Sequence, residues 1–167
     1  DNPHQVVTNP EVDILVEVMG GLEPARELIA SALKNGTPVA TANKAVMAKH
    51  GDLFLSLAHE GLTAIRYEAC VGAGIPILGP LRTQLAGNAI QSIQGIVNGT
   101  TNYLLSRMEQ EQAELSPLLS DAQRLGYAEA DPSADVDGLD AQSKLALLCA
   151  EAWGQLPEVD SIERTGI

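Results

Sequence analysis

Aromatic and basic residues are scarce in this sequence, and each shortage excludes a class of protein. Phe and Trp occur once each among 167 residues, so Ala, Leu and Val must build most of the core. Only 10 Lys and Arg stand against 22 Asp and Glu, which gives a net charge of −12. That charge would repel a phosphate backbone or an anionic membrane surface, so we expect no nucleic-acid partner and no membrane partner.

Long apolar runs and paired cysteines are also missing. No run reaches the roughly 18 apolar residues of a membrane span, and the chain does not open with the cationic and apolar regions of a signal peptide. Cys70 and Cys149 lie far apart and form no CxxC motif, and the three histidines lack zinc-site spacing. We therefore expect a reducing compartment, the cytoplasm.

Strands and helices alternate along the first half of the sequence, which predicts a layered α/β fold with a largely parallel sheet. Runs rich in β-branched residues predict strands at residues 12–18, 38–41, 62–68 and 90–97. Capping and glycine signals predict helices at residues 24–35, 45–60 (with Gly51 as a candidate break), 76–86, 103–112, 116–126 and 138–153. Residues 127–137 are predicted to form an irregular loop.

The glycine-rich turn of a dinucleotide-binding domain, GxGxxG after a first strand, is absent from this sequence. The nearest string runs from Val71 to Pro76 and has only two of the glycines. The pattern is therefore typical of the second half of a Rossmann-like domain, not of its beginning.

The densest cluster of ionisable residues lies between Gly126 and Lys144. Five carboxylates fall within the 12 residues from Glu129 to Asp140, and they would repel one another unless a cation lies near. Asp140 and Lys144 are four residues apart on a predicted helix, so they share one face. The alternative is a solvated acidic loop with a surface ion pair, and the spacing does not match a calcium-binding EF-hand.

Three further strings lie where α/β folds bind ligands. Thr41-Ala42-Asn43-Lys44 follows a strand, so its lysine can face a substrate or belong to a capping loop. The glycines of Glu68–Pro76 let backbone groups approach a ligand or form a tight turn. Asn98-Gly99-Thr100-Thr101-Asn102 precedes a helix, where exposed amides favour an anion or simply cap the helix.

Together, these strings resemble the homoserine dehydrogenase family. The matching segments are Thr41–Lys44, Glu68–Pro76, Gly95–Tyr103 and Leu125–Lys144. The resemblance spans about Val12 to Ile167 and implies the reversible, NAD(P)H-dependent reduction of L-aspartate 4-semialdehyde to L-homoserine, a step toward threonine and methionine. It also implies a small-molecule substrate and a homodimer formed through the hydrophobic sheet of this domain.

The resemblance further implies roles for individual residues. Lys144 is then the catalytic lysine, and Lys44 lies between nicotinamide and substrate as a catalytic and cofactor-binding residue. Glu129 and Asp140 hold the substrate amino group, with Asp135 nearby. General chemistry agrees, since an ammonium group stabilises the charge that develops on an aldehyde oxygen and carboxylates suit an α-ammonium group.

Two more sites are implied by the resemblance alone. Gly126 lies near the cofactor. A sodium ion is surrounded mainly by main-chain groups of Glu68, Val71, Ala73 and Ile75, which suits a hard cation that prefers oxygen ligands.

The family pattern divides the chain into three parts. Residues 1–62 are then the C-terminal part of an incomplete dinucleotide-binding domain, residues 63–154 an α+β domain for substrate binding, catalysis and dimerisation, and residues 155–167 a return segment or linker. Because the GxGxxG half is missing, we expect the isolated chain to bind NAD(P) poorly and to have little or no dehydrogenase activity.

Two other functions stay open from the sequence. The chain could be a non-catalytic dimerisation module of a larger α/β protein, with its acidic loop as solvated surface. Alternatively, an aldehyde substrate could form a Schiff base with Lys44 or Lys144.

Overall fold

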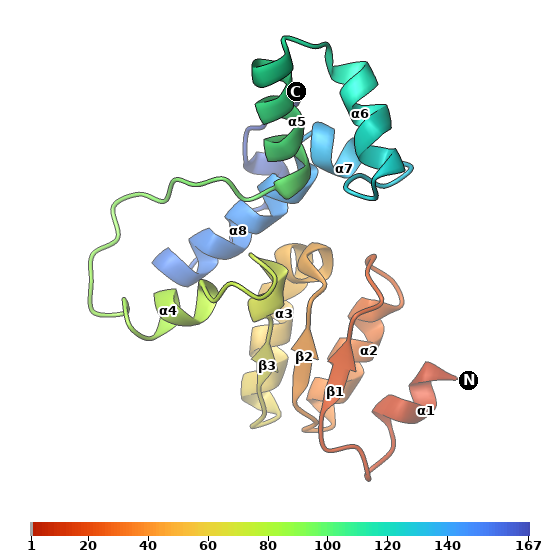
Figure 1. Ribbon diagram of the computed structural model, residues 1–167. Helices are drawn as coiled ribbons and strands as arrows, with labels where there is room; N and C mark the ends of the chain where they lie inside the picture. Colours follow the sequence, from red (N-terminus) through yellow and green to blue (C-terminus); the bar gives the residue numbers. More distant parts are fainter. Residues whose placement is uncertain (1) are drawn as a thin grey trace. The chain divides into compact units, whose positions relative to one another are not determined.

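The computed structural model describes residues 2–167, which form two compact units (Figure 1). The first unit comprises the chain up to Gln91 together with Ser143–Ser161, and the second comprises Ser92–Gln142 with Ile162–Ile167. Helix α8 (Leu139–Trp153) contributes its first residues to the second unit and the rest to the first.

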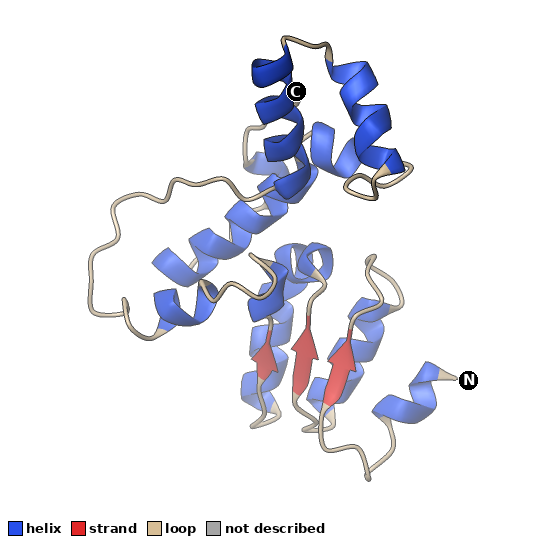
Figure 2. Cartoon of the chain, in the orientation of Figure 1, coloured by secondary structure: helices blue, strands red, loops and turns tan. Residues whose placement is uncertain are grey.

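The first unit is built on a three-stranded parallel sheet in the order β1-β2-β3, which confirms the predicted α/β class. The strands are β1 (Leu15–Glu17), β2 (Val39–Thr41) and β3 (Ile65–Arg66), with Val39 paired to Leu15 on one side and to Ile65 on the other. Helices α2 (Ala25–Lys34) and α3 (Lys44–Glu60) connect the strands and cover one face of the sheet (Figure 2).

The core of this unit lies between the sheet and its two helices. Its fully buried side chains include Ile29 and Leu33 of α2, Met47 and Phe54 of α3, and Val39 of β2. The lone phenylalanine therefore lies in the core, and aliphatic side chains supply most of the remaining apolar burial.

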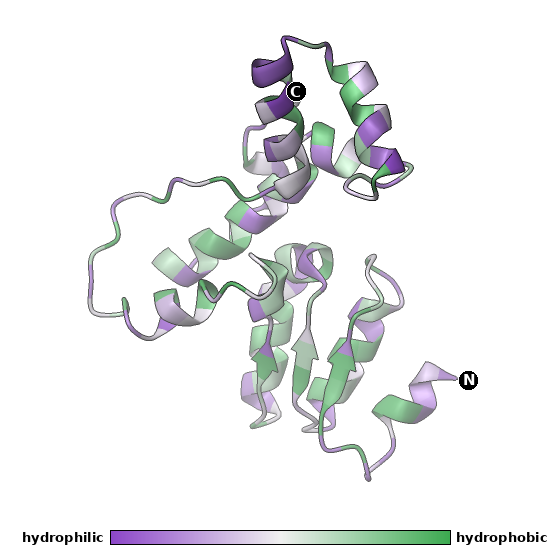
Figure 3. Ribbon diagram, viewed as in Figure 1, coloured by the Kyte–Doolittle hydropathy of each residue, from purple (hydrophilic) through white to green (hydrophobic). Residues whose placement is uncertain are grey.

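Strand β1 leaves a row of apolar side chains exposed, and its ribbon is green in the hydropathy colouring of Figure 3. Ile14, Val16 and Val18 are 60%, 65% and 70% exposed, and they alternate along the chain as residues on one side of a strand do. The face of β1 away from the helices is therefore apolar.

Short helices complete the first unit. Helix α1 (Pro3–Val7) precedes β1, the 3₁₀ helix η1 (Glu68–Cys70) follows β3, and α4 (Leu78–Arg82) comes next along the chain. A second 3₁₀ helix, η2 (Val159–Ser161), follows α8.

The second unit is helical. It contains α5 (Gly99–Glu111), α6 (Leu115–Arg124), α7 (Ser133–Val136) and the start of α8. Its small core consists of Leu104, Leu118, Ala122 and Ala128. The rings of Tyr103 and Tyr127 lie 4.9 Å apart, so the loop after α6 packs against α5.

The prediction of a strand at residues 90–97 is wrong, because these residues form no regular structure. A strand needs a hydrogen-bonded neighbour, and within residues 2–167 only β1, β2 and β3 pair. Ile96 is 78% exposed, so β-branched composition alone did not produce a strand.

Several predicted boundaries also differ from the structure. Helix α3 is continuous, so the suggested break at Gly51 is wrong: this glycine is buried, and a Cβ there would lie 3.1 Å from Cδ2 of Leu156. Helix α5 begins four residues earlier than predicted because Asn98 caps it. Helix α7 lies inside the predicted loop 127–137, and α4 is shorter than the predicted helix 76–86.

Within residues 2–167, no helix combines the length and the apolar character needed to cross a bilayer.

Candidate functional site

The first candidate segment, Thr41–Lys44, is held at the carboxyl end of β2 by a buried carboxylate. Glu17, the last residue of β1, is 3% exposed and accepts hydrogen bonds from Oγ1 of Thr41 at 2.6 Å and from the backbone N–H of Met19 at 2.8 Å. The loops that follow β1 and β2 are therefore tied together at the edge where open α/β sheets bind ligands.

Asn43 completes this arrangement and begins helix α3. Its Oδ1 accepts from the backbone N–H of Val46 at 3.2 Å, and its Nδ2 donates to the carbonyl oxygen of Gly21 at 2.7 Å. Lys44 follows as the first residue of α3 and is partly buried. The backbone that leads into Lys44 is thus fixed by the cap at Asn43 and by the contact of Thr41 with Glu17.

The candidate segment that starts at Asn98 brings two of the predicted acids, Asp135 and Asp140, to the Asn98 side chain. Nδ2 of Asn98 donates to Oδ1 of Asp135 at 2.6 Å and to Oδ2 of Asp140 at 3.0 Å. Asp140 is 8% exposed and Asn98 is 9% exposed, so both lie away from bulk water. The acidic segment is therefore not merely a solvated loop at these positions.

The other predicted residues of the acidic segment, Lys144, Glu129 and Gly126, have different surroundings from one another. Lys144 lies one turn after Asp140 on α8, where residues four apart share a face, and it is partly buried. Glu129 is exposed, and its main-chain carbonyl accepts from Nε2 of Gln123 at 3.0 Å. Gly126 has a φ of +79°, which suits the glycine that ends α6.

The candidate cation turn, Glu68–Pro76, begins at Glu68, whose carboxylate is hydrogen-bonded to backbone amides of the same chain. It accepts hydrogen bonds from the backbone N–H groups of Ile77 at 2.6 Å, Leu78 at 2.9 Å and Gly79 at 2.6 Å. Desolvation opposes ionisation, but these hydrogen bonds outweigh it and lower the pKa of Glu68 below its ordinary value. A cation held by this turn would therefore meet main-chain oxygens.

The backbone of this turn is tightly folded. Gly72 and Ala73 have φ values of +78° and +51°, so the chain reverses tightly there. A Cβ at Gly72 would lie 3.1 Å from the carbonyl oxygen of Ile75, so a larger residue would crowd that oxygen. Among residues 2–167, no three His, Cys, Asp or Glu residues group as metal ligands.

Cys70 lies within the Glu68–Pro76 segment, at the end of η1, and is buried. It is 2% exposed, and its thiol contacts the carbonyl oxygen of Thr41 at 3.6 Å. Burial raises the pKa of Cys70 to about 12, so the thiol is protonated at neutral pH.

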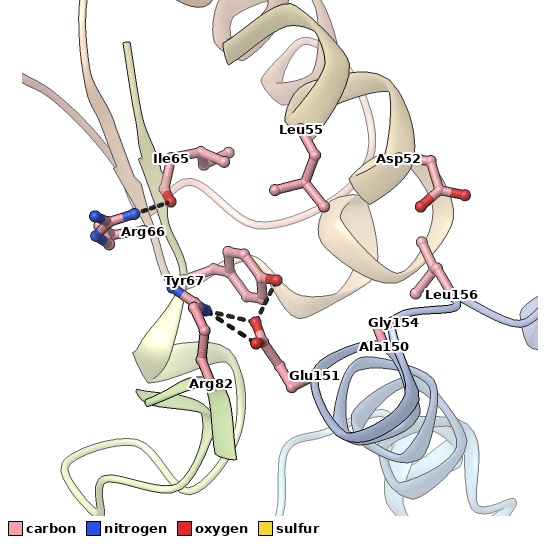
Figure 4. A pocket seen from close by; sticks show the side chains of 10 residues that line it. All are labelled: Asp52, Leu55, Ile65, Arg66, Tyr67, Arg82, Ala150, Glu151, Gly154 and Leu156. Atoms are coloured by element: carbon pink, nitrogen blue, oxygen red, sulfur yellow. Dashed lines mark hydrogen bonds and ion pairs between the residues drawn. The ribbon is translucent and has the colours of Figure 1, made fainter. Parts of the chain in front are cut away.

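A pocket of about 300 Å³ lies in the first unit near a buried carboxylate that the sequence analysis missed (Figure 4). Glu151 of α8 accepts a hydrogen bond from the hydroxyl of Tyr67 at 2.5 Å and from Nε of Arg82 at 2.9 Å. Burial and the hydrogen bond to Glu151 raise the pKa of Tyr67 above its usual range. The lining residues are Asp52, Leu55, Ile65, Arg66, Tyr67, Arg82, Ala150, Glu151, Gly154 and Leu156.

The structural roles of Glu17 and of the Asn98 side chain were likewise not predicted from the sequence. A charged residue at the end of an apolar strand could have indicated Glu17, because such a carboxylate needs partners if it is buried. The segment containing Asn98 was singled out only for its backbone amides.

Two family models match the chain. The model described as homoserine dehydrogenase matches residues 76–167, and the model described as homoserine dehydrogenase, NAD binding domain, matches residues 1–68. Homoserine dehydrogenase from Synechocystis sp. is 51% identical over 162 residues, which cover 97% of this chain and 37% of the relative. The relative from Corynebacterium glutamicum is 46% identical, with 97% and 36% covered. The chain therefore spans little more than a third of these relatives.

Solved structures give the same result. A homoserine dehydrogenase from Thiobacillus denitrificans has a TM-score of 0.96 and 47% identity, covering 99% of this chain and 38% of that one. A hyperthermophilic archaeal homoserine dehydrogenase in complex with NADPH has a TM-score of 0.92 and 37% identity, with 99% and 51% covered.

Proposed function

Because the chain belongs to the homoserine dehydrogenase family, we propose that it forms the central, substrate-binding part of an enzyme that interconverts L-homoserine and L-aspartate 4-semialdehyde. The observation that carries this proposal is the pair of carboxylates, Asp135 and Asp140, joined through Asn98, with Lys144 one turn further on α8. An amino-acid aldehyde needs carboxylates to bind its amino group and an ammonium group to act on its carbonyl oxygen.

The acids bind the substrate amino group. Asp140 and Glu129 accept hydrogen bonds from the α-ammonium group, and Asp135 adds negative charge nearby. The burial of Asp140 supports this role, because a carboxylate in a medium of low polarity gains from meeting a cation.

The two lysines act on the carbonyl end of the substrate. When bound, NAD(P)H supplies the hydride that reduces the aldehyde carbon. The ammonium group of Lys144 stabilises the negative charge that develops on the aldehyde oxygen and provides the proton for it, directly or through water. Lys44, at the carboxyl end of the sheet, lies between nicotinamide and substrate in this arrangement.

The cofactor and the cation are part of the same proposal. The match of residues 1–68 to an NAD binding domain and the archaeal relative solved with NADPH support an NAD(P) cofactor. Gly126 lies beside it, where nothing lies within 4 Å of an added Cβ. Main-chain oxygens of Glu68, Val71, Ala73 and Ile75 are the proposed sodium ligands.

The proposal extends to assembly and location. We infer a homodimer in the cytoplasm that takes part in threonine and methionine biosynthesis. Family membership supports this, as does the exposed side chain of Ile96, since an exposed apolar residue can be covered by a second copy.

Activity measurements on the full-length enzyme that carries this chain test the proposal. We expect the isolated chain to show little or no turnover, and Lys144→Ala to lower kcat by about 100-fold or more, the usual contribution of a positioned acid. Asp140→Ala should raise KM for homoserine. Unchanged rates in both variants would favour the non-catalytic dimerisation module. Reduction with borohydride followed by mass spectrometry tests for a Schiff base, which we do not expect.

A further inference from the structure

Asn98 performs two tasks with the two ends of one amide. Its Oδ1 accepts from the backbone N–H of Thr101 at 2.8 Å and from Oγ1 of Thr101 at 3.0 Å, which caps helix α5. Its Nδ2 donates to Asp135 and to Asp140. The orientation is determined, because the reverse would place a carbonyl oxygen against two carboxylates.

The two carboxylates come from different helices. Asp135 lies in α7 and Asp140 in the first turn of α8, and both are distant in sequence from Asn98, by 37 and 42 residues. Carboxylates held this close repel each other unless a donor or a cation lies between them. The amide is neutral and has two N–H bonds, so it can serve both acids without adding a charge.

We propose that Asn98 is a positioning residue for substrate binding: it holds Asp135 and Asp140 side by side so that they meet the ammonium group of the amino-acid substrate together. This inference rests on the proposed function. Only one oxygen of each carboxylate takes part in the bonds to Asn98. The substrate ammonium then meets two carboxylates that are already held together, and the acids need not move to receive it.

The rival explanation is that Asn98 only caps α5. Serine and aspartate are both good capping residues, because each offers a side-chain oxygen to the first turn of a helix. Asn98→Ser therefore keeps the cap and removes the amide donor. Asn98→Asp keeps the cap and replaces the donor with a third carboxylate.

Steady-state kinetics of the full-length enzyme separate the two explanations. We expect Asn98→Ser to raise KM for homoserine about tenfold or more, the size of a lost hydrogen bond to a charged group, while KM for NAD(P)⁺ changes less than about twofold. Asn98→Asp should raise KM for homoserine further, because three carboxylates repel one another. Adding Asp135→Asn to Asn98→Asp restores an amide among the acids, so it should recover part of this loss.

Asn2 provides a matched control. It caps α1 by accepting from the backbone N–H of His4 at 3.0 Å, so Asn2→Ser and Asn2→Asp make the same chemical changes at a simple cap. These variants should keep both KM values. Thermal unfolding of every variant shows whether the helices are retained.

The outcomes distinguish this inference from the proposed function. A wild-type enzyme that does not oxidise homoserine contradicts the proposed function itself. An active wild type with an unchanged KM for homoserine in Asn98→Ser overturns the positioning role alone. Equal increases in KM for homoserine and for NAD(P)⁺, or unfolding of both Asn98 variants, would assign Asn98 to folding. Either result would overturn the positioning role as well.

Discussion

The hydroxyl of Tyr67 donates a hydrogen bond to the carboxylate of Glu151, 84 residues further along the chain, at 2.5 Å. Tyr67 is buried, and the Glu151 side chain is 6% exposed. Arg82 forms an ion pair with the same carboxylate and lies over the Tyr67 ring, 5.4 Å from its centre. This contact fastens helix α8, which carries Lys144, to the end of strand β3 (Figure 4).

Replacing Glu151 should destabilise the first unit. In Glu151→Ala, the buried Tyr67 hydroxyl and the Arg82 guanidinium lose their common partner, which we expect to cost about 2–4 kcal/mol. Urea unfolding measures the change, and Glu163→Ala, at an exposed position, serves as the control. A loss no larger than that of the control would show that the contact contributes nothing to stability.

The Glu68 carboxylate should make the free energy of unfolding depend on pH in the acidic range. Because its folded pKa is lowered, its contribution is present above the ordinary value of about 4.5 and is lost as the pH falls through the folded pKa. Glu68→Gln should therefore be less stable than the wild type at neutral pH, and the difference should shrink below about pH 4.5. Urea midpoints across this range measure it.

Glu11→Gln provides the comparison for Glu68, since Glu11 is exposed. Its difference from the wild type should be small at every pH. A Glu68→Gln difference that stays constant down to strongly acidic pH would contradict the role of the three amide hydrogen bonds.

The two cysteines should differ in reactivity. Cys70 is 2% exposed and burial raises its pKa to about 12, whereas Cys149 is partly exposed. A thiol-alkylating reagent should therefore modify Cys149 first in the native protein and both cysteines in urea. Mass spectrometry of Cys149→Ser, which should stay unmodified until it unfolds, checks this. Rapid native labelling of Cys70 would contradict the observed burial.

Local signals in the sequence determined several elements of the fold. Pro24 and Gly36 bound helix α2 in the sequence, and α2 forms between them because both residues act through their own backbone angles. The alternation of strands with helices likewise determined the parallel sheet, since parallel neighbours need a crossover between them. The four strings that indicated the family are also local.

Other features of the fold and of the site depended on the tertiary structure, because local sequence patterns do not determine them. Residues 90–97 have a strand composition but form no strand, and Gly51 is a packing contact instead of a helix break, because both outcomes depend on distant neighbours. The same holds for the acids: the sequence named Asp135 and Asp140, but folding brought Asn98 to them from 37 and 42 residues away. Hydrogen bonds across such separations follow from helix packing, which no local pattern records.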